Sequence, residues 1–282
     1  DPGEKVIFGS GKAGFDFYSF FVQFKFNHKI SRIIVGDYTV SFGQGLTAWS
    51  GSGFSSNENI ISICKSGRGI YPSTSTDENR YLRGIAIEGK WKSLKWYSWF
   101  SSHKIDGNVE VDTIDGSEYL RSLLTSGYHR TQSESSGYHV CRETYFGTNL
   151  NFETKGWKLG LTGAGQMFSI PIKKTLQNYN QFDFRGSSNI NFGFDYNKNF
   201  KNLLIFGEVG MSSNMAIAFM NGILISAGKN ISISAAHHNY QKEFHSMKSN
   251  AIGSNTNPAN ENGIYFGTTI KLNKALALTT YV

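Results

Sequence analysis

The sequence lacks any long hydrophobic run. No apolar stretch among its 282 residues approaches the roughly 20 residues that a transmembrane helix requires. Any membrane span must therefore be made of strands. Helical heptads and a solenoid repeat of fixed period are absent as well. The first residues, Asp1 to Lys5, are polar and acidic rather than basic and then apolar, so they do not form a signal peptide, and we expect an exported chain in mature or excised form.

Cysteine is also scarce. The chain has two, Cys64 and Cys141, with no CxxC spacing, so a zinc site is not expected. Each falls in or beside a long polar segment. If both segments lie on one side of the molecule, the two cysteines could form a disulfide in an oxidising compartment, and two unpaired thiols are the alternative. The GSGK near the start lacks the Walker spacing, and we expect no cofactor and no metal.

Charge of one sign is not concentrated anywhere. The chain has 28 Lys and Arg against 21 Asp and Glu, a net charge of +7, and the basic residues are spread along it. An anionic partner is permitted, but no residues of this chain specifically support nucleic acid.

Aromatic residues are what the sequence has in excess. They make up 15% of the chain, although apolar residues overall are only 39%. Much aromatic surface with little aliphatic bulk suits a wall one side chain thick, apolar outside and polar inside. We find no shift of composition that would divide the chain, and expect a single domain over residues 1–282.

Period-two alternation predicts the strands. In Ser31–Gly43, for example, Ile34, Tyr38 and Val40 fall on one face and Asp37 on the other. The predicted strands are Phe15–Asn27, Ser31–Gly43, Leu82–Lys90, Leu94–Ser102, Cys141–Glu153, Trp157–Phe168, Ser188–Asn197, Phe200–Met211, Met215–Ser226, Asn230–Tyr240, Gly263–Leu272 and Ala275–Val282.

These strands form six hairpins. Each is closed by a short turn that contains Lys, and mostly long polar connections join the hairpins, the first of them Gln44 to Tyr81. A soluble sandwich is not expected to sort its loops in this way, whereas outer-membrane barrels do. The sequence therefore predicts an all-β fold, an antiparallel transmembrane β-barrel with about 12 strands in this chain, in the bacterial outer membrane.

Several motifs resemble a known family. They are GDYTVSFGQGLTAWSG (36–51), GRGIYPSTSTDENRYLRG (67–84), GYHRT (127–131), YNQFDFRG (179–186) and HHNYQKEFHSMKSNA (237–251). Over nearly the whole chain, and in the same order, the sequence looks like the barrel region of Bacteroidota ComEA-like, helix-hairpin-helix-containing proteins. The resemblance implies an outer-membrane location. It also implies a link to DNA uptake, with DNA as one possible cargo.

The chain departs from that family where a DNA-binding role is inferred. No helix-hairpin-helix segment is present, so that role is carried over to no residue here. Because membrane barrels often end on an aromatic residue, the ending Tyr281, Val282 leads us to expect further strands, with this chain part of a longer barrel.

A group of charged and aromatic residues near the end of the first long loop is the candidate binding or constriction site. It comprises Arg68, Tyr71, Asp77, Glu78, Arg80 and Arg83. Such a group could narrow a barrel mouth or form a ledge for a substrate, or it could be an ion-pair network that only packs the loop. Along the strands, Glu88, Glu143, Glu153 and Asp195 are expected to face the lumen, since charge on the lipid face is costly.

Two further groups of residues are candidates for a catalytic site and for a metal site. His237, His238 and His245 suggest a Ser-His-acid hydrolase of an outer-membrane lipase type, but no GxSxG elbow is present and we expect no enzyme. The acidic segment 104–120 does not fit an EF-hand, and a solvated loop is the alternative to Ca²⁺ binding.

The predicted function is a non-enzymatic channel or an accessory subunit of an envelope transport machine, in contact with outer-membrane lipids and envelope partner proteins. Two alternatives stay open, a soluble β-rich module that binds glycans and an outer-membrane lipid hydrolase.

Overall fold

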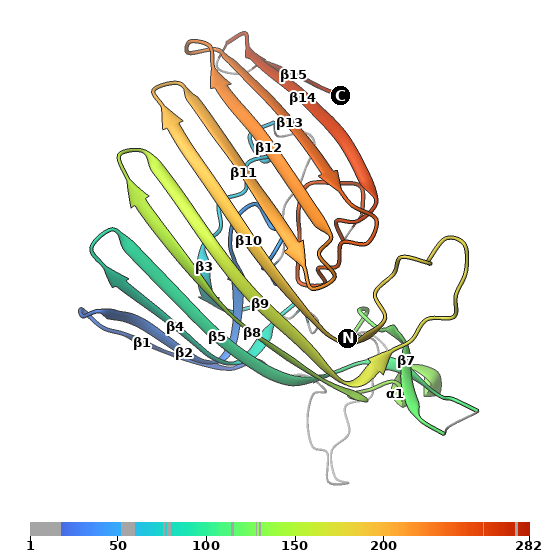
Figure 1. Cartoon of the computed structure of the whole chain (residues 1–282). Coiled ribbons are helices and arrows are strands. Elements are labelled where there is room, and N and C mark those ends of the chain that lie inside the picture. Colours follow the sequence, from blue (N-terminus) through green and yellow to red (C-terminus); the bar gives the residue numbers. More distant parts are fainter. Residues whose placement is uncertain are drawn as a thin grey trace.

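Alternation of apolar and polar side chains produces an almost wholly β structure (Figure 1). The computed structural model describes residues 18–51, 60–75, 77, 80–113, 116–127, 129, 131–255, 257–273 and 276–282. The elements are β1 (Phe21–Lys25), β2 (Ile30–Ser41), β3 (Gly69–Pro72), β4 (Leu82–Trp91), β5 (Leu94–Ile105), β6 (Gly107–Val111), β7 (Glu118–Leu123), α1 (Gln132–Ser136), β8 (Cys141–Thr154), β9 (Trp157–Ile172), β10 (Gly186–Phe200), β11 (Leu203–Ser212), β12 (Ile217–Ser226), β13 (Ile231–Tyr240), β14 (Glu261–Lys271) and β15 (Ala277–Tyr281).

Twelve of the fifteen strands form one continuous antiparallel sheet, in the order β1-β2-β4-β5-β8-β9-β10-β11-β12-β13-β14-β15. The prediction of an all-β, antiparallel, barrel-type sheet with about 12 strands is confirmed. The sheet is strongly curved, but among the described residues no strand pairing joins β1 to β15, so it is not closed. The three additional strands, β3, β6 and β7, lie in the long connections and were not predicted.

Short turns lie at one end of the sheet, and the long connections lie at the other (Figure 1). Lys92, Lys155 and Lys201 adopt φ of 54°, 39° and 39°, as two-residue hairpin turns require. One predicted turn is displaced. The turn expected at Asn197–Asn199 lies at residues 201–202, because β10 continues to Phe200 and pairs through its last residue with Leu203. The connection of β11 to β12, residues 213–216, is the short exception at the loop end.

No helix in the described part of the chain is long and apolar enough to cross a membrane.

The two faces of the sheet differ sharply in character. On the convex face a row of apolar side chains crosses five neighbouring strands at directly paired positions: Leu150, Leu161, Phe194, Val209 and Phe219. Leu161 and Phe192 on this face are 57% and 56% exposed. One residue further along each strand, the concave face carries Asn151, Gly160, Asp195, Glu208 and Met220 at directly paired positions. From β8 to β12 the exposed face is therefore apolar along this row, while the covered face carries charged and amide side chains.

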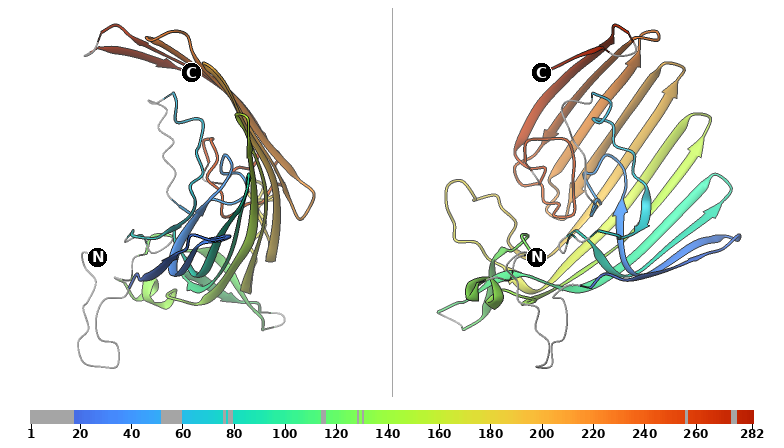
Figure 2. Two further views of the ribbon diagram at one scale, coloured as in Figure 1. Left: turned by 90° about the vertical axis from the view of Figure 1, so that its left-hand side faces the viewer. Right: turned by 180° about the vertical axis from the view of Figure 1, so that it is seen from behind.

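The core lies between the concave face and two loop segments that fold back onto it (Figure 2). Phe42, from the first long connection, packs against Tyr97 and Trp99 of β5, with ring centroids 5.1 and 5.3 Å away. Phe244, from the connection of β13 to β14, is buried in a second cluster with Phe206 of β11. Loops thus supply the layer that a second sheet would supply in a sandwich.

Candidate functional site

Two inner segments occupy the concave side of the sheet. The first inner segment comprises residues 42–51 and 60–68, and the second comprises residues 241–255 and 257–260. Both follow a strand at the loop end, and both turn inward rather than away from the sheet (Figure 2). They cover polar side chains of the wall, and those side chains hold them there.

Glu208 on β11 fixes the first inner segment. One carboxylate oxygen accepts hydrogen bonds from the backbone N–H groups of Gln44 and Leu46 at 2.6 and 3.1 Å. The other accepts from the backbone N–H and the hydroxyl of Thr47, at 3.0 and 2.9 Å. Glu208 is 2% exposed, and a buried carboxylate is tolerated only when its oxygens are satisfied in this way.

The two inner segments are bonded to each other. The backbone N–H of Asn250 donates to the Gly45 carbonyl at 2.7 Å, and that of Trp49 donates to the Lys248 carbonyl at 2.9 Å. The Lys65 ammonium group donates to the Asn250 side-chain oxygen at 2.7 Å and also to its carbonyl. Segments about 200 residues apart in sequence therefore form one hydrogen-bonded unit, called here the plug.

A second buried glutamate, Glu143 on β8, holds the other half of the plug. Its carboxylate forms an ion pair with the Lys248 ammonium group, 2.8 Å away, and accepts a hydrogen bond from the Gln166 amide at 2.5 Å. His103 on β5 lies 3.8 Å from the same carboxylate. Each inner segment is thus attached to the wall through its own carboxylate.

One set of contacts resembles a Ser-His-acid triad, because His103 lies between Ser101 and Glu143. Its geometry does not suit catalysis. The Ser101 hydroxyl lies 3.3 Å from His103 Nδ1. Ser101 is fully buried, however, and its oxygen accepts a hydrogen bond from the Arg83 backbone N–H at 2.9 Å. A nucleophile must reach a substrate carbonyl, which this hydroxyl does not do.

The histidines and acidic residues singled out from the sequence have partners of their own. His238 contacts Glu261 at 3.1 Å, and His237 contacts Asn262 at 3.2 Å on the opposite face. In the acidic segment Asp106 contacts His129 at 2.9 Å and Glu110 contacts Arg121 at 2.8 Å. Within the described residues, no group of three potential metal ligands is found.

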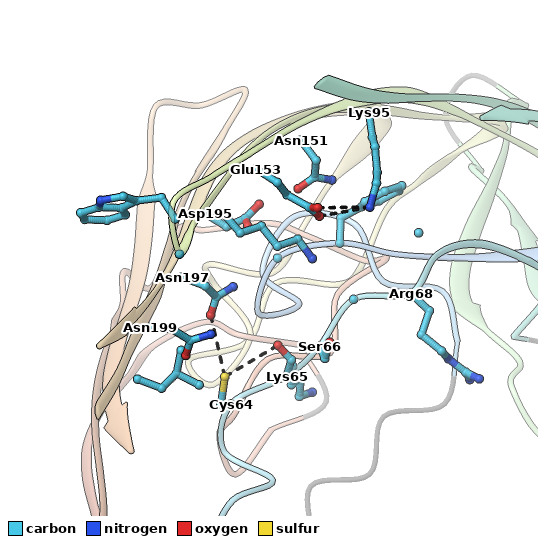
Figure 3. A pocket seen from close by; sticks show the side chains of 18 of the residues that line it. Cys64, Lys65, Ser66, Arg68, Lys95, Asn151, Glu153, Asp195, Asn197 and Asn199 are labelled. Atoms are coloured by element: carbon cyan, nitrogen blue, oxygen red, sulfur yellow. Dashed lines mark hydrogen bonds and ion pairs between the residues drawn. The ribbon is translucent and has the colours of Figure 1, made fainter. Parts of the chain in front are cut away.

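A cavity of about 700 Å³ lies between the plug and the turn end of the wall (Figure 3). The first inner segment contributes Cys64, Lys65 and Arg68. The wall contributes side chains from β5, β8, β9 and β10, together with the turn between β8 and β9. The lining polar residues are Cys64, Lys65, Ser66, Arg68, Lys95, Tyr97, Asn151, Glu153, Thr154, Lys155, Lys158, Asp195, Asn197 and Asn199.

The predicted site residues do not form one ring. Arg68 and Tyr71 lie together, with the guanidinium 5.1 Å from the ring centroid, and Arg68 lines the cavity. Asp77 and Arg80 pair with each other at 3.6 Å, and Glu78 lies outside the described residues.

Arg83 is engaged elsewhere. It forms a two-pronged ion pair with Asp37 of β2 at 2.6 and 2.9 Å, and donates to the Tyr18 carbonyl at 2.7 Å. Arg83 therefore joins the N-terminal side of the sheet, and the role of the whole group as a constriction stays a prediction.

Of the two alternatives for Cys64 and Cys141, a disulfide or two unpaired thiols, the structure has two free thiols. Cys64 Sγ lies 3.9 Å from the Asn197 side chain at the turn end of the wall. Cys141 begins β8 at the loop end, twelve residues before the cavity residue Glu153, a strand length of about 40 Å. The first loop folds inward along the wall instead of staying beside the second. Burial raises the pKa of the Cys64 thiol to about 11, although Lys158 opposes this, so the group is protonated at neutral pH.

Of the lumen-facing carboxylates, Glu143, Glu153 and Asp195 lie on the concave face as predicted, with Glu143 and Asp195 buried. Glu88 pairs with Arg32 and lies opposite the inward-facing Tyr97. Glu208 was missed. Its strand, FKNLLIFGEVGM, has apolar residues at both parities, so no alternation marks the inner face, and a single carboxylate among them was the only signal.

No protein-family model and no curated protein matches the chain. Two solved structures of OmpT, an in-vitro folded outer membrane protein of Vibrio cholerae, are similar to it. The trimer form has a TM-score of 0.38 and 8% sequence identity, over 89% of this chain and 77% of that chain. The second has a TM-score of 0.35 and 8% identity, over 89% of this chain and 72% of that chain.

Proposed function

We propose that the chain is a non-enzymatic outer-membrane β-barrel protein that acts as a channel closed by its plug. The supporting observation is the reversal of the two faces of the sheet. Exposed apolar rows on the convex face suit lipid, and charged and amide side chains on the concave face suit a lumen. At the turn end, Trp91, Trp157 and Phe200 are exposed, as expected of aromatic residues at a membrane interface.

The plug gives the proposal its mechanism. A loop that fills a wide barrel sets what passes, and here two loops are bonded together and attached to the wall through Glu208 and Glu143. Release of the plug would open the lumen. The family resemblance makes DNA one candidate cargo, and an accessory subunit of an envelope transport machine is the alternative role for the same barrel.

Conductance in planar bilayers tests the closed channel. The detergent-purified wild type is expected to insert and pass little steady current. Glu208→Ala leaves the backbone N–H groups of Gln44, Leu46 and Thr47 without their acceptor. Each buried N–H group left unpaired destabilises the docked plug by about 1–3 kcal/mol. The variant should therefore show a conductance several-fold higher than the wild type.

Glu118→Ala is the matched control, because Glu118 is exposed on β7, and it should behave as the wild type. Insertion without current from wild type and Glu208→Ala alike would favour the accessory subunit. A chain that is extracted without detergent and inserts under no condition would contradict the barrel and favour the soluble glycan-binding module.

A further inference from the structure

The cavity at the turn end carries an excess of positive charge. Five of its lining residues are cationic and two are anionic, a net charge of +3. Lys65 directs its ammonium group to Asn250, and Lys95 pairs with Glu153 at 3.2 Å. In the part of the chain that the structure describes, no carboxylate lies within salt-bridge distance of the other three, Arg68, Lys155 and Lys158.

Cations without a carboxylate at salt-bridge distance concentrate anions when they line a walled cavity. A cleft lined by charge of one sign and bounded by low-dielectric walls focuses the field more strongly than the same charges on an open surface. Here the plug forms one wall and β8 to β10 form the other, and Arg68, Lys155 and Lys158 all line the cavity between them.

Amide groups add directional donors to this field. Asn197 and Asn199 lie on β10 beside the cavity (Figure 3). Asn151 on β8 also lines it, but its amide donates to the side-chain oxygen of Asn149. An amide NH₂ group donates to carboxylate and phosphate oxygens, and a charge-assisted bond of this kind is stronger than one between neutral groups. The volume of about 700 Å³ falls within the range of small-ligand sites.

We propose that this cavity binds a small soluble organic anion that carries carboxylate or phosphate groups. Its oxygens would be held by Lys155 and Lys158 from the wall and by Arg68 from the plug. Lipid headgroups do not compete for the site, because the cavity lies on the concave side of the sheet, behind the face that carries the exposed apolar rows. A ligand in this position contacts wall and plug together and strengthens their association.

The test is calorimetric titration of the detergent-solubilised full chain with citrate and with inorganic pyrophosphate, at fixed ionic strength. We expect saturable binding of at least one of the two anions. We expect no binding of trehalose, a neutral solute. The double replacement Lys155→Gln with Lys158→Gln should weaken binding at least about tenfold, since it removes two charge-assisted contacts. Lys229→Gln is the matched control, because Lys229 lies in another hairpin turn and does not line the cavity; its affinity should stay within about twofold of the wild type.

A second variant separates loss of the site from loss of folding. Glu153→Gln removes a negative charge from the cavity and frees Lys95, so it should tighten anion binding about threefold or more, which a misfolded protein cannot do. The proposal is overturned if the wild type shows no saturable anion binding, if trehalose binds equally well, if Lys229→Gln weakens binding as much as the double replacement, or if Glu153→Gln leaves the affinity unchanged.

Discussion

At the scale of single residues, the plug depends on buried carboxylates that are paired with donors of the plug. Glu208 accepts four hydrogen bonds, from the backbone of Gln44, Leu46 and Thr47 and from the Thr47 hydroxyl. Glu143 pairs with Lys248 and accepts from Gln166. Neither carboxylate can be exchanged for an apolar residue of similar size, because the donors opposite it would then be buried without an acceptor. The chemical identity of these residues, more than their volume, therefore holds the plug.

Lys65 predicts how docking of the plug depends on pH. Burial lowers its pKa to about 8 from the usual 10.5, although Glu208 opposes the shift. Between these two values the released segment binds more protons than the docked one, so docking should strengthen as the pH rises from about 8 toward 10.5. Below pH 8 the lysine is charged in both states and its unfavourable contribution is constant. The measurement is the urea midpoint for release of the plug, followed with a fluorophore on an introduced cysteine.

Lys65→Met supplies the comparison for this pH dependence. The variant has no group to titrate, so its midpoint should change less between pH 8 and pH 10 than that of the wild type. Equal changes in the two proteins would show that Lys65 does not govern docking.

At the scale of strands and loops, the sequence predicted the wall well and the plug poorly. The alternation in Ser188–Asn197 predicted which side chains of β10 lie on each face. Such alternation is strong in a barrel wall because one face meets lipid and the other meets the lumen. The plug has no such period. Its position depends on bonds such as Asn250 to Gly45 and Gln44 to Glu208, between residues with no common pattern in the sequence. The same applies to β3, whose four residues form a strand only by pairing with β2.

The convex face of β10 gives a prediction about the membrane. Phe192 is 56% exposed near the middle of this strand, and Phe200 is 48% exposed at its turn end. Arg on a lipid-facing strand costs about 2–4 kcal/mol at the midplane and about 0–1 near the interface. Phe192→Arg should therefore lower the folded yield in lipid vesicles strongly, and Phe200→Arg only slightly, as read from heat-modifiable gel mobility. Equal yields for the two variants would argue against a lipid-facing β10.

Gly45 gives a prediction about the contact between the inner segments. Its φ of +91° disfavours other residues, and a Cβ there would also overlap the Asn250 carbonyl oxygen. Gly45→Ala should separate the two segments and speed amide hydrogen exchange at residues 44–50 about tenfold or more.

Gly228→Ala is the control for strain alone. Gly228 has a similar φ of +86°, but a Cβ there meets nothing within 4 Å. If Gly228→Ala accelerates exchange at residues 44–50 as much as Gly45→Ala does, the effect does not come from the contact between the segments.

At the scale of the whole molecule, the described chain is a curved wall with a filled interior and two unpaired edges, on β1 and β15. A strand edge in lipid leaves backbone N–H and C=O groups without partners, which a membrane does not tolerate. The expectation of further strands in a longer barrel stays a prediction.

The long sequence separations within the plug also set an order of events during folding. The hydrogen bond from Gln44 to Glu208 joins residues 164 positions apart, and the bond from Lys65 to Asn250 joins residues 185 apart. Local hairpins close in microseconds, whereas contacts of this range form only after the intervening chain is in place. The wall must therefore assemble while its interior is still empty and wet. In the proposed channel, docking of the plug is therefore the last step of folding, and each new copy passes through an open state before the plug docks.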